Sequence, residues 1–340
     1  MTRVNVNVTI KKREEKRMVT RRDVAELAGV SPATVSYYIN GKNYVSKETG
    51  EKIARAIETL GYRPNLIAKS LKSKDTRQLV FLCNEIRNPF HAQVAYDVTN
   101  IAYEHGYTML FCNVIDDVEY INRLCGYQVS GFFIATSKIS VKAINSIAEK
   151  NIPVVFLTDM VKPEIDTRVS RIIIDYSYVM DELIKVMKRK GVKSICYISS
   201  ALDGEDGKTE SVKNAVGREN VSLKILYGIA SAKSAYEEFV KNFKNTELPH
   251  GCVCANDAVA AGVLRAAYDM GYRCPEDILI AGIDNTIDSD ISIPSITTID
   301  NRKEEISKKA IEMLLKKIRE EEVSDYVIRT TVRYKESTGK

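Results

Sequence analysis

From Gln78 onward, short apolar runs alternate with helical stretches, and this alternation leaves few folds open to the 340-residue chain. The runs lie at residues 79–83, 107–112, 131–135, 153–157, 171–174, 195–198, 251–255 and 278–283. Apolar runs of this length between helices predict a doubly wound parallel sheet. The region spans roughly 260 residues, which is enough for two such sheets. The expected fold class is therefore α/β.

Composition excludes several classes of protein. Hydrophobic residues make up 44% of the chain and charged residues 28%, which are ordinary values for a globular protein with buried cores. No apolar stretch approaches the length of about 18 residues that a membrane span needs, and the first 17 residues lack the apolar segment of a secretion signal. We therefore expect a cytoplasmic protein without a membrane partner.

The sequence carries no sign of a metal, a cofactor or catalysis. Its seven cysteines form no C-x-x-C pair and only three histidines occur, which argues against a disulfide framework and a zinc site. The phosphate-binding motifs G-x-G-x-x-G and G-x-x-x-x-G-K-[ST] are absent, as are the H-E-x-x-H and G-x-S-x-G motifs of hydrolases. We expect no cofactor, and we do not expect an enzyme.

Charge divides the chain into two parts. Residues 1–74 contain 16 Lys and Arg against 7 Asp and Glu, whereas residues 75–340 contain 34 against 38. The excess is not confined to the first 17 residues, because residues 18–74 still hold 10 basic against 5 acidic side chains. This asymmetry predicts a basic module that binds a polyanion, joined to a module with another task.

Three short helices are predicted within residues 20–62, because apolar residues recur at helical spacing between capping residues. Ser31 followed by Pro32, and Ser46, are typical helix starts, while Gly29 and Gly61 are typical helix ends. The apolar positions are Val24, Leu27 and Ala28 in the first helix, Val35 and Ile39 in the second, and Ile53, Ile57 and Leu60 in the third.

The turn between the first two helices is only three residues long, which predicts a helix-turn-helix. In that motif the second helix enters the major groove of DNA. Its outward positions are Ala33, Thr34, Ser36 and Tyr37, whose small or hydroxyl-bearing side chains permit close approach to phosphates and base edges. An inert three-helix bundle is the alternative, and the basic charge argues against it.

These residues carry a resemblance to a known family. The stretch TRRDVAELAGVSPATVS at 20–36, with Asn40, Val45-Ser46, Gly61-Tyr62, Pro64-Asn65 and AKSL at 68–71, resembles the lactose-repressor (LacI/GalR) family of bacterial transcription regulators. The resemblance extends from about residue 18 to about residue 334 and leaves residues 1–17 as a basic N-terminal extension. It implies a helix-turn-helix DNA-binding headpiece at 18–64, a hinge helix or linker at 65–74 and an effector-binding and dimerisation core at 75–340.

The resemblance also implies that the core consists of two periplasmic-binding-protein-like subdomains, each a doubly wound parallel sheet. The chain would cross between them three times, near residues 174, 298 and 324. The N-subdomain would then comprise 75–174 and 299–324, and the C-subdomain 175–298 and 325–340.

Contacts to DNA follow from the same resemblance. The residues that would bind phosphates and set the register are Thr20, Ser31, Thr34, Ser36, Asn40, Ser46, Tyr62 and Asn65. Ala33 and Tyr37 would face bases. Tyr37 occupies the position at which the family usually has an arginine that reads guanine, and a tyrosine cannot make that bidentate pair. We therefore expect a half-site that differs from the common one.

Residues 65–72 are capable of forming a helix but are too short to form a stable one alone, since isolated helices below about 12–15 residues are marginal. The family places paired hinge helices in the minor groove of DNA. Here Leu71 would insert between bases as an apolar wedge, with Ala68 on the same DNA-contacting segment. A plain linker is the alternative.

Polar residues that directly follow apolar strands are candidates for a ligand site, because ligands of open α/β sheets bind beyond the carboxyl ends of strands. Each of them could instead be a helix cap or a turn residue. With the resemblance, the expected effector-binding residues are Phe90, His91, Asp159, Lys208, Asn256, Asp257 and Asp284.

Several of these positions depart from the family. Lys208 replaces the arginine that usually clamps the ligand, His91 replaces an aromatic residue, and Ala230 stands where the family usually has a stacking ring. Lysine lacks the bidentate fork of arginine, and alanine offers no ring face to a sugar. A common hexose or purine is therefore disfavoured, while an unusual sugar, a sugar derivative or another metabolite is compatible with the site.

The sequence thus predicts a transcriptional regulator of the repressor type. It would bind a palindromic double-stranded DNA operator as a homodimer, under the control of a small-molecule effector between the two subdomains. The alternative is a constitutive or protein-partnered DNA binder whose effector pocket has decayed.

Overall fold

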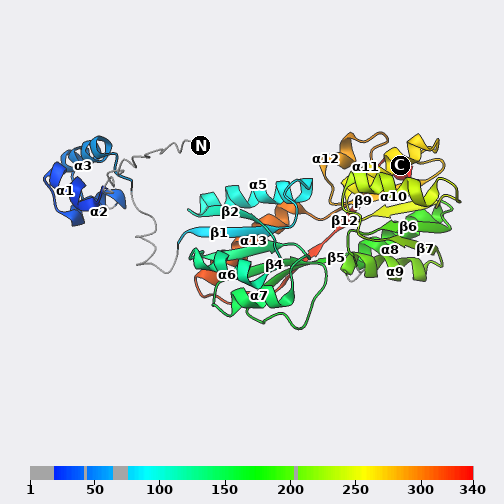
Figure 1. Cartoon of the computed structure of the whole chain (residues 1–340), viewed down its shortest axis with the longest axis horizontal. Helices are drawn as coiled ribbons and strands as arrows, with labels where there is room; N and C mark the ends of the chain where they lie inside the picture. Colours follow the sequence, from blue (N-terminus) through cyan, green and yellow to red (C-terminus); the bar gives the residue numbers. More distant parts are fainter. Residues whose placement is uncertain (1–18, 42–43, 64–75, 203–205, 340) are drawn as a thin grey trace, which may run out of the picture. The chain divides into compact units, whose positions relative to one another are not determined.

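The computed structural model describes residues 19–41, 44–63, 76–202 and 206–339. Contacts divide the chain into two units, residues 1–72 and 73–340, and Figure 1 labels most of the helices and strands of both. The predicted positions Asn65, Ala68 and Leu71 lie outside the described residues.

The first unit contains three helices in its described part, namely α1 (Arg21–Ala28), α2 (Pro32–Ile39) and α3 (Lys47–Leu60). Side-chain caps begin each of them: Thr20, Ser31 and Ser46 accept a hydrogen bond from the backbone three residues later. Gly29 and Gly61 end α1 and α3 in the left-handed conformation. A small core buries the apolar stripes, with Val24, Val35 and Ile53 fully enclosed.

The second unit is built on two six-stranded sheets within the residues that the structure describes. The first sheet has the order β11-β5-β4-β3-β1-β2, and all its pairs are parallel. Its strands are β1 (Gln78–Cys83), β2 (Thr108–Asn113), β3 (Gly131–Ala135), β4 (Val154–Thr158), β5 (Ser170–Asp175) and β11 (Tyr326–Arg329).

Helices cover both faces of this sheet, as the alternation of side chains along β1 requires. Leu79 and Phe81 pack with residues of α5 (Pro89–Glu104) and α13 (Lys303–Ile318). Val80 and Leu82 point the other way and pack with residues of α6 (Val118–Gly126) and α7 (Val141–Ala148). Both faces are therefore buried, which explains why the strands read as continuous apolar runs.

The second sheet has the order β12-β10-β9-β8-β6-β7, and only β12 runs antiparallel among its described pairs. Its strands are β6 (Ser194–Ile198), β7 (Ser222–Leu226), β8 (Gly251–Cys254), β9 (Leu279–Ile283), β10 (Thr297–Asp300) and β12 (Thr331–Arg333). Its helices are α8 (Ser177–Arg189), α9 (Gly207–Arg218), α10 (Ala232–Phe243), α11 (Asp257–Asp269) and the short α12 (Ile287–Ile291), and a 3-10 turn follows at Glu336–Thr338.

The chain passes between the two sheets after β5, after β10 and after β11. The expected third crossover near residue 324 is therefore corrected: β11 pairs with β5 in the first sheet, so the passage comes after Arg329. The second crossover also lies later than residue 298, because β10 continues to Asp300 beside β9. These strands are only four residues long, and the apolar pattern of the sequence did not reveal them.

No helix in the described part of the chain is long and apolar enough to cross a membrane.

Candidate DNA-binding face and effector site

The outer face of α2 is formed by the residues expected to meet DNA. Val35 is fully buried, whereas Ala33 and Tyr37 are exposed and lie one helical turn apart on the same face. The hydroxyl groups of Ser31 and Thr34 are 2.9 Å apart, and the Thr34 N–H donates to Ser31 Oγ. The start of α2 thus presents a cluster of hydroxyls next to an exposed methyl group and an aromatic ring.

The other expected DNA positions differ in exposure. Thr20, Asn40 and Ser46 are exposed, and Ser36 is half-buried. Asn40 donates from Nδ2 to the carbonyl oxygen of Ser36 at 2.7 Å, which fixes its side chain at the end of α2. Tyr62 is buried in the headpiece core, so its ring supports α1 and α3 from within.

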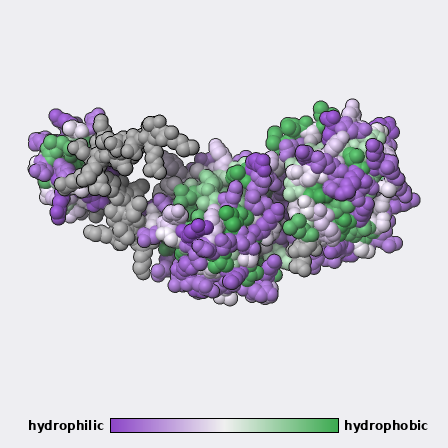
Figure 2. Space-filling view, viewed as in Figure 1, coloured by the Kyte–Doolittle hydropathy of each residue, from purple (hydrophilic) through white to green (hydrophobic). Residues whose placement is uncertain are grey.

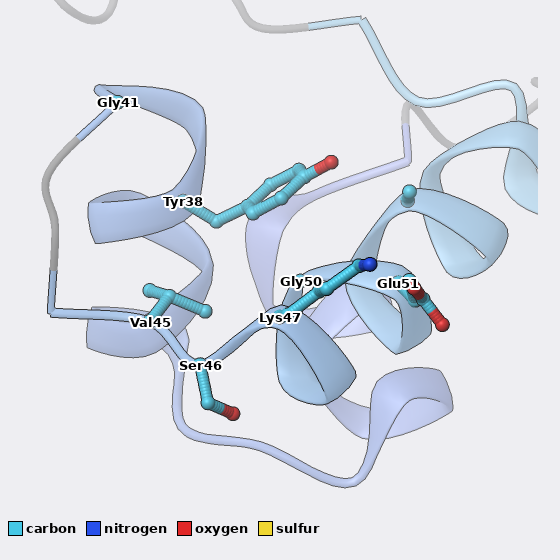
Figure 3. A pocket seen from close by; sticks show the side chains of 8 residues that line it. Tyr38, Gly41, Val45, Ser46, Lys47, Gly50 and Glu51 are labelled. Atoms are coloured by element: carbon cyan, nitrogen blue, oxygen red, sulfur yellow. The ribbon is translucent and has the colours of Figure 1, made fainter.

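A groove of about 460 Å³ runs between α2 and α3, and Figure 3 shows the side chains that line it. Tyr38 lies on one side of it and Gly50 of α3 on the other. A Cβ atom at Gly50 would lie 3.1 Å from the Tyr38 ring, so a glycine within this helix lets the two helices approach. The exposed Ser46 and Lys47 at the start of α3 rim the groove.

In the core, Lys208 and Asp159 bring the two subdomains together. Asp159 follows β4 of the first sheet, and Lys208 lies in the first turn of α9 beside the second. The Lys208 N–H donates to Asp159 Oδ2 at 3.4 Å, and Lys208 Nζ donates to the Ala255 carbonyl at 3.1 Å. A Cβ atom at Gly207 would lie only 2.0 Å from the Asp159 carbonyl oxygen. The backbones therefore meet at a point that only glycine permits.

Charged groups surround this contact. Burial acts against the charge of Lys208, but Asp284, Tyr197, Asp159 and Asp206 together outweigh it, and the pKa of the ammonium group is raised. Burial likewise raises the pKa of the Asp159 carboxyl, with Lys208 opposing the shift. The Lys208 ammonium also lies 5.5 Å from the centre of the Tyr176 ring, within reach of a cation–π contact.

His91 and Phe90 contribute from the first subdomain. Both are buried in the first turn of α5, with ring centres 5.4 Å apart. His91 Nδ1 is 3.0 Å from the Glu85 carbonyl oxygen. Burial lowers the pKa of the imidazole, and the nearby Lys208 adds to this effect while Asp284 opposes it. His91 is therefore a neutral ring at the edge of the charged cluster at physiological pH.

Asp284 lies beside the second crossover. It is buried after β9 with a φ of 104°, and its Oδ1 accepts a hydrogen bond from Asn301 Nδ2 at 2.7 Å. Lys303, at the start of α13, donates to the carbonyl oxygens of Asp284 and Asn285 at 2.6 and 2.7 Å. The second crossover thus holds the loop that carries Asp284.

Asn256 and Asp257 have their side chains engaged within the chain. Asn256 caps α11 by accepting the Val259 N–H at 2.9 Å. Asp257 is fully buried and accepts hydrogen bonds from the backbone and hydroxyl of Thr286 and from the hydroxyl of Thr298. Asn256 therefore stabilises the start of α11 itself, whereas Asp257 fastens α11 to the loop after β9 and to β10.

Two buried polar atoms of the cluster have no hydrogen-bond partner in the structure, namely Tyr197 Oη and Asn301 Oδ1. Tyr197 is fully buried and Asn301 is 1% exposed. Leaving such atoms unpaired is costly, and in native proteins it commonly marks the place of a water or a ligand. The region between the sheets therefore has the chemistry of a polar ligand site.

Sequence reasoning missed Tyr176, Asn301, Lys303 and Tyr197 in this cluster. A signal existed for the first two, because Tyr176 directly follows β5 and Asn301 directly follows β10. Tyr197 lies inside β6, and nothing in the sequence marks it. Among the residues that the structure describes, no group of three or more His, Cys, Asp or Glu side chains could hold a metal ion.

Known protein families match both the headpiece and the core of the chain. Residues 20–65 match the family model of bacterial regulatory proteins of the lacI family, and residues 184–338 match that of a periplasmic binding protein-like domain. The HTH-type transcriptional repressor PurR of Histophilus somni is 30% identical over 325 residues, which cover 89% of this chain and 93% of that protein. Catabolite control protein A of Priestia megaterium is 27% identical over 332 residues, covering 94% and 99%.

Solved structures share the fold. The lac repressor dimer bound to operator and an anti-inducer matches with a TM-score of 0.80 at 24% identity, covering 95% of this chain and 99% of that chain. The transcriptional regulator CelR in complex with cellobiose matches with a TM-score of 0.67 at 23% identity, covering 94% and 99%. The expected fold class, a helix-turn-helix headpiece joined to a core of two doubly wound sheets, is confirmed.

A helix-turn-helix unit joined to a two-sheet ligand-binding core defines a DNA-binding transcription regulator. The chain belongs to the lacI family of bacterial regulatory proteins; it is a transcriptional repressor and not an enzyme.

Proposed function

We propose that the protein represses transcription as a homodimer on a palindromic operator and that a small effector bound between its subdomains controls this binding. The observation that carries the DNA half is the exposed outer face of α2 beside the hydroxyls of Ser31 and Thr34. Two such faces related by a two-fold axis would read two half-sites of opposite direction. Leu71 and Ala68 would contact the minor groove at the centre of the operator.

The residues assigned to phosphates and register are those at the caps and hydroxyl-bearing positions of the headpiece. They are Thr20, Ser31, Thr34, Ser36, Asn40, Ser46 and Asn65. Tyr62 would act from the headpiece core by holding the helices in place. Ala33 and Tyr37 are assigned to the bases.

The effector site is assigned to the cluster between the two sheets. Lys208, Asp159 and Asp284 would bind the effector directly, with His91 and Phe90 forming one wall. Asn301 and Tyr197, whose buried oxygen atoms lack partners, would complete the polar lining. Asn256 and Asp257 would shape the site from behind, because their own side chains are already hydrogen-bonded within the chain.

Hydroxyl-rich effectors suit this lining, since carboxylates, an ammonium and an amide can each bind sugar hydroxyls. A lacI-family regulator from Enterococcus faecium was solved with bound ribose, and CelR with cellobiose. We therefore propose a sugar or sugar derivative as the class of effector. Control of DNA binding would follow from a shift in the angle between the subdomains.

A homodimer is supported by apolar side chains left on the surface of the second subdomain. Ile287 and Ile291 of α12 are 60% and 67% exposed, and the nearby Ile293 is 93% exposed. Figure 2 shows hydrophobic surface along the edge of the core where α12 lies. Apolar groups gathered on one surface are typical of a protein–protein interface.

Selection on randomised DNA duplexes tests the operator proposal. The protein should enrich a palindromic sequence, and its affinity should fall steeply with salt because many phosphate contacts release counterions. Enrichment of a single half-site without symmetry would overturn the homodimer on a palindrome. Failure to enrich any sequence, with or without sugars present, would overturn sequence-specific binding.

Lys208→Met tests the effector site. In a thermal-shift screen of mono- and disaccharides, we expect the native protein to be stabilised by at least one sugar and this variant to lose the response while still binding the operator. Lys213→Met is the matched control, since Lys213 is an exposed residue of the same helix. An unchanged response in Lys208→Met would remove Lys208 from the site. A native protein that responds to no sugar would favour a constitutive DNA binder.

A further inference from the structure

Two aromatic rings meet on the exposed side of the headpiece. Tyr37 of α2 is 43% exposed, and Tyr44, in the segment between α2 and α3, is 81% exposed. Their ring centres are 5.8 Å apart, and their planes are inclined by 58°. Tilted contacts of this kind are a preferred geometry for aromatic pairs. The position of one ring therefore restricts the position of the other.

The stability of the headpiece does not account for this pair. Its core is made by residues such as Val24, Val35 and Ile53, with Tyr38 and Val45 packed against them, and it includes neither Tyr37 nor Tyr44. The neighbouring residue Tyr38 shows the contrast, because its ring turns inward against α3. Two large rings that are partly (Tyr37) and mostly (Tyr44) exposed on this face of the headpiece are better explained by what they contact in the complex.

The chemistry of the major groove limits what a tyrosine ring can read. Guanine presents two acceptors, which suit a bidentate arginine, and a phenol cannot pair with both. The one apolar group that base pairs present in this groove is the C5-methyl group of thymine. Ala33, one turn before Tyr37 on the same face, adds a second apolar contact surface.

We propose that Tyr37 reads a thymine methyl group in each half-site and that Tyr44 is a positioning residue that holds the Tyr37 ring for this contact. The inference rests on the proposed operator binding and specifies which base the aromatic pair selects. At this position an arginine would select guanine. Here an apolar contact with thymine would provide the specificity instead.

Uracil substitution tests the contact directly, because uracil differs from thymine only by the missing methyl group. After the preferred operator has been selected, each thymine of a half-site is replaced in turn and the dissociation constant is measured. We expect a replacement in one half-site alone to weaken binding about fourfold, as the loss of one buried methyl contact predicts, and the same replacement in both half-sites to weaken it about fifteenfold.

Variants of the two tyrosines show which side chain causes the preference for thymine over uracil. Tyr37→Ala should bind thymine and uracil operators equally, whereas Tyr37→Phe should keep the preference because it keeps the ring. Tyr44→Ala should reduce the preference, and Tyr44→Phe should restore it. Circular dichroism of each variant checks that the headpiece remains folded, as expected for side chains outside its core.

The proposal is overturned if no uracil substitution in the half-site weakens binding, or if Tyr37→Ala keeps the full preference for thymine. A Tyr44→Ala variant with an unchanged preference would remove the positioning role. These failures differ from failure of the proposed function, in which the native protein would select no operator at all.

Discussion

Asp257 begins α11 without any exposed surface, and burial together with the nearby charge of Asp284 raises its pKa to about 7. Hydrogen bonds from Thr286 and Thr298 oppose the shift but do not cancel it. An unfolded aspartate has a pKa of about 3.9, so the folded protein binds this proton more tightly than the unfolded chain does. Folding therefore favours the protonated, neutral form of the Asp257 carboxyl over the charged form.

The pH dependence of stability follows from this difference. Between pH 4 and pH 7, Asp257 should lower the free energy of unfolding as pH rises, by up to about 1.4 kcal/mol per pH unit, and the effect should level off above pH 7. His91 acts in the opposite direction, since its lowered pKa costs stability as pH falls below about 6.5. The contribution of Asp257 is isolated by comparing the native protein with a variant that lacks this carboxyl group.

We expect Asp257→Asn to flatten the pH dependence, because the amide can keep hydrogen bonds to the two threonines without a charge. The measurement is the free energy of unfolding in urea of the native protein and the variant, from pH 5 to pH 8. The gap between them should change with pH in favour of the variant at high pH. Parallel curves would show that Asp257 does not titrate in this range.

The sequence predicts the role of a single residue well when that role depends only on its neighbours in the chain. Ser31, Ser46 and Gly61 were predicted as caps, and they cap the helices, because a cap depends on residues within one turn. The roles of Asn301 and Lys303 were not predicted, because both depend on the loop of Asp284, which lies 17 and 19 residues away in sequence and is brought beside them by the parallel pairing of β9 with β10.

The two subdomains are in close contact at the start of α9. Gly207→Ala would place a methyl group against the Asp159 carbonyl oxygen, where a Cβ atom has only 2.0 Å. We expect the variant to lose the Lys208–Asp159 contact and to unfold at a temperature lower by a few degrees, since overpacking costs about 1–3 kcal/mol. X-ray scattering should report a larger radius of gyration for the core.

Gly217→Ala, in the same helix, is the control. A Cβ atom there meets nothing within 4 Å, so the change should leave the dimensions of the core unaltered and add slightly to helix stability. If the two variants behave alike in both measurements, the close approach at Gly207 does not hold the subdomains together.

Elements differed in how far the sequence predicted them. Buried strands such as β1 and β3 were predicted because both of their faces lie under helices and all their residues after Gln78 are apolar or glycine. The edge strand β7 was not predicted, since its residues are exposed or half-buried and no continuous apolar run marks it. The short strands β11 and β12 carry charged residues and were missed for the same reason.

For the whole molecule, the exposed isoleucines of α12 lead to a test of assembly. We expect the double variant Ile287→Asp, Ile291→Asp to sediment as a monomer and to bind a palindromic operator at least tenfold more weakly, because the two headpieces would then act separately. Ile115→Asp is the control, as Ile115 is similarly exposed, at 54%, in the first subdomain. A dimeric double variant would place the interface elsewhere.

The third crossover has a consequence for how the protein is made. The headpiece helices end at Leu60 and can fold as soon as they leave the ribosome, whereas the first sheet is complete only when Tyr326–Arg329 has been synthesised. Until then one edge of β5 is unpaired. One edge of β10 also remains unpaired until its antiparallel partner β12 has been synthesised. During most of translation, a complete three-helix headpiece is therefore attached to an unfinished regulatory core.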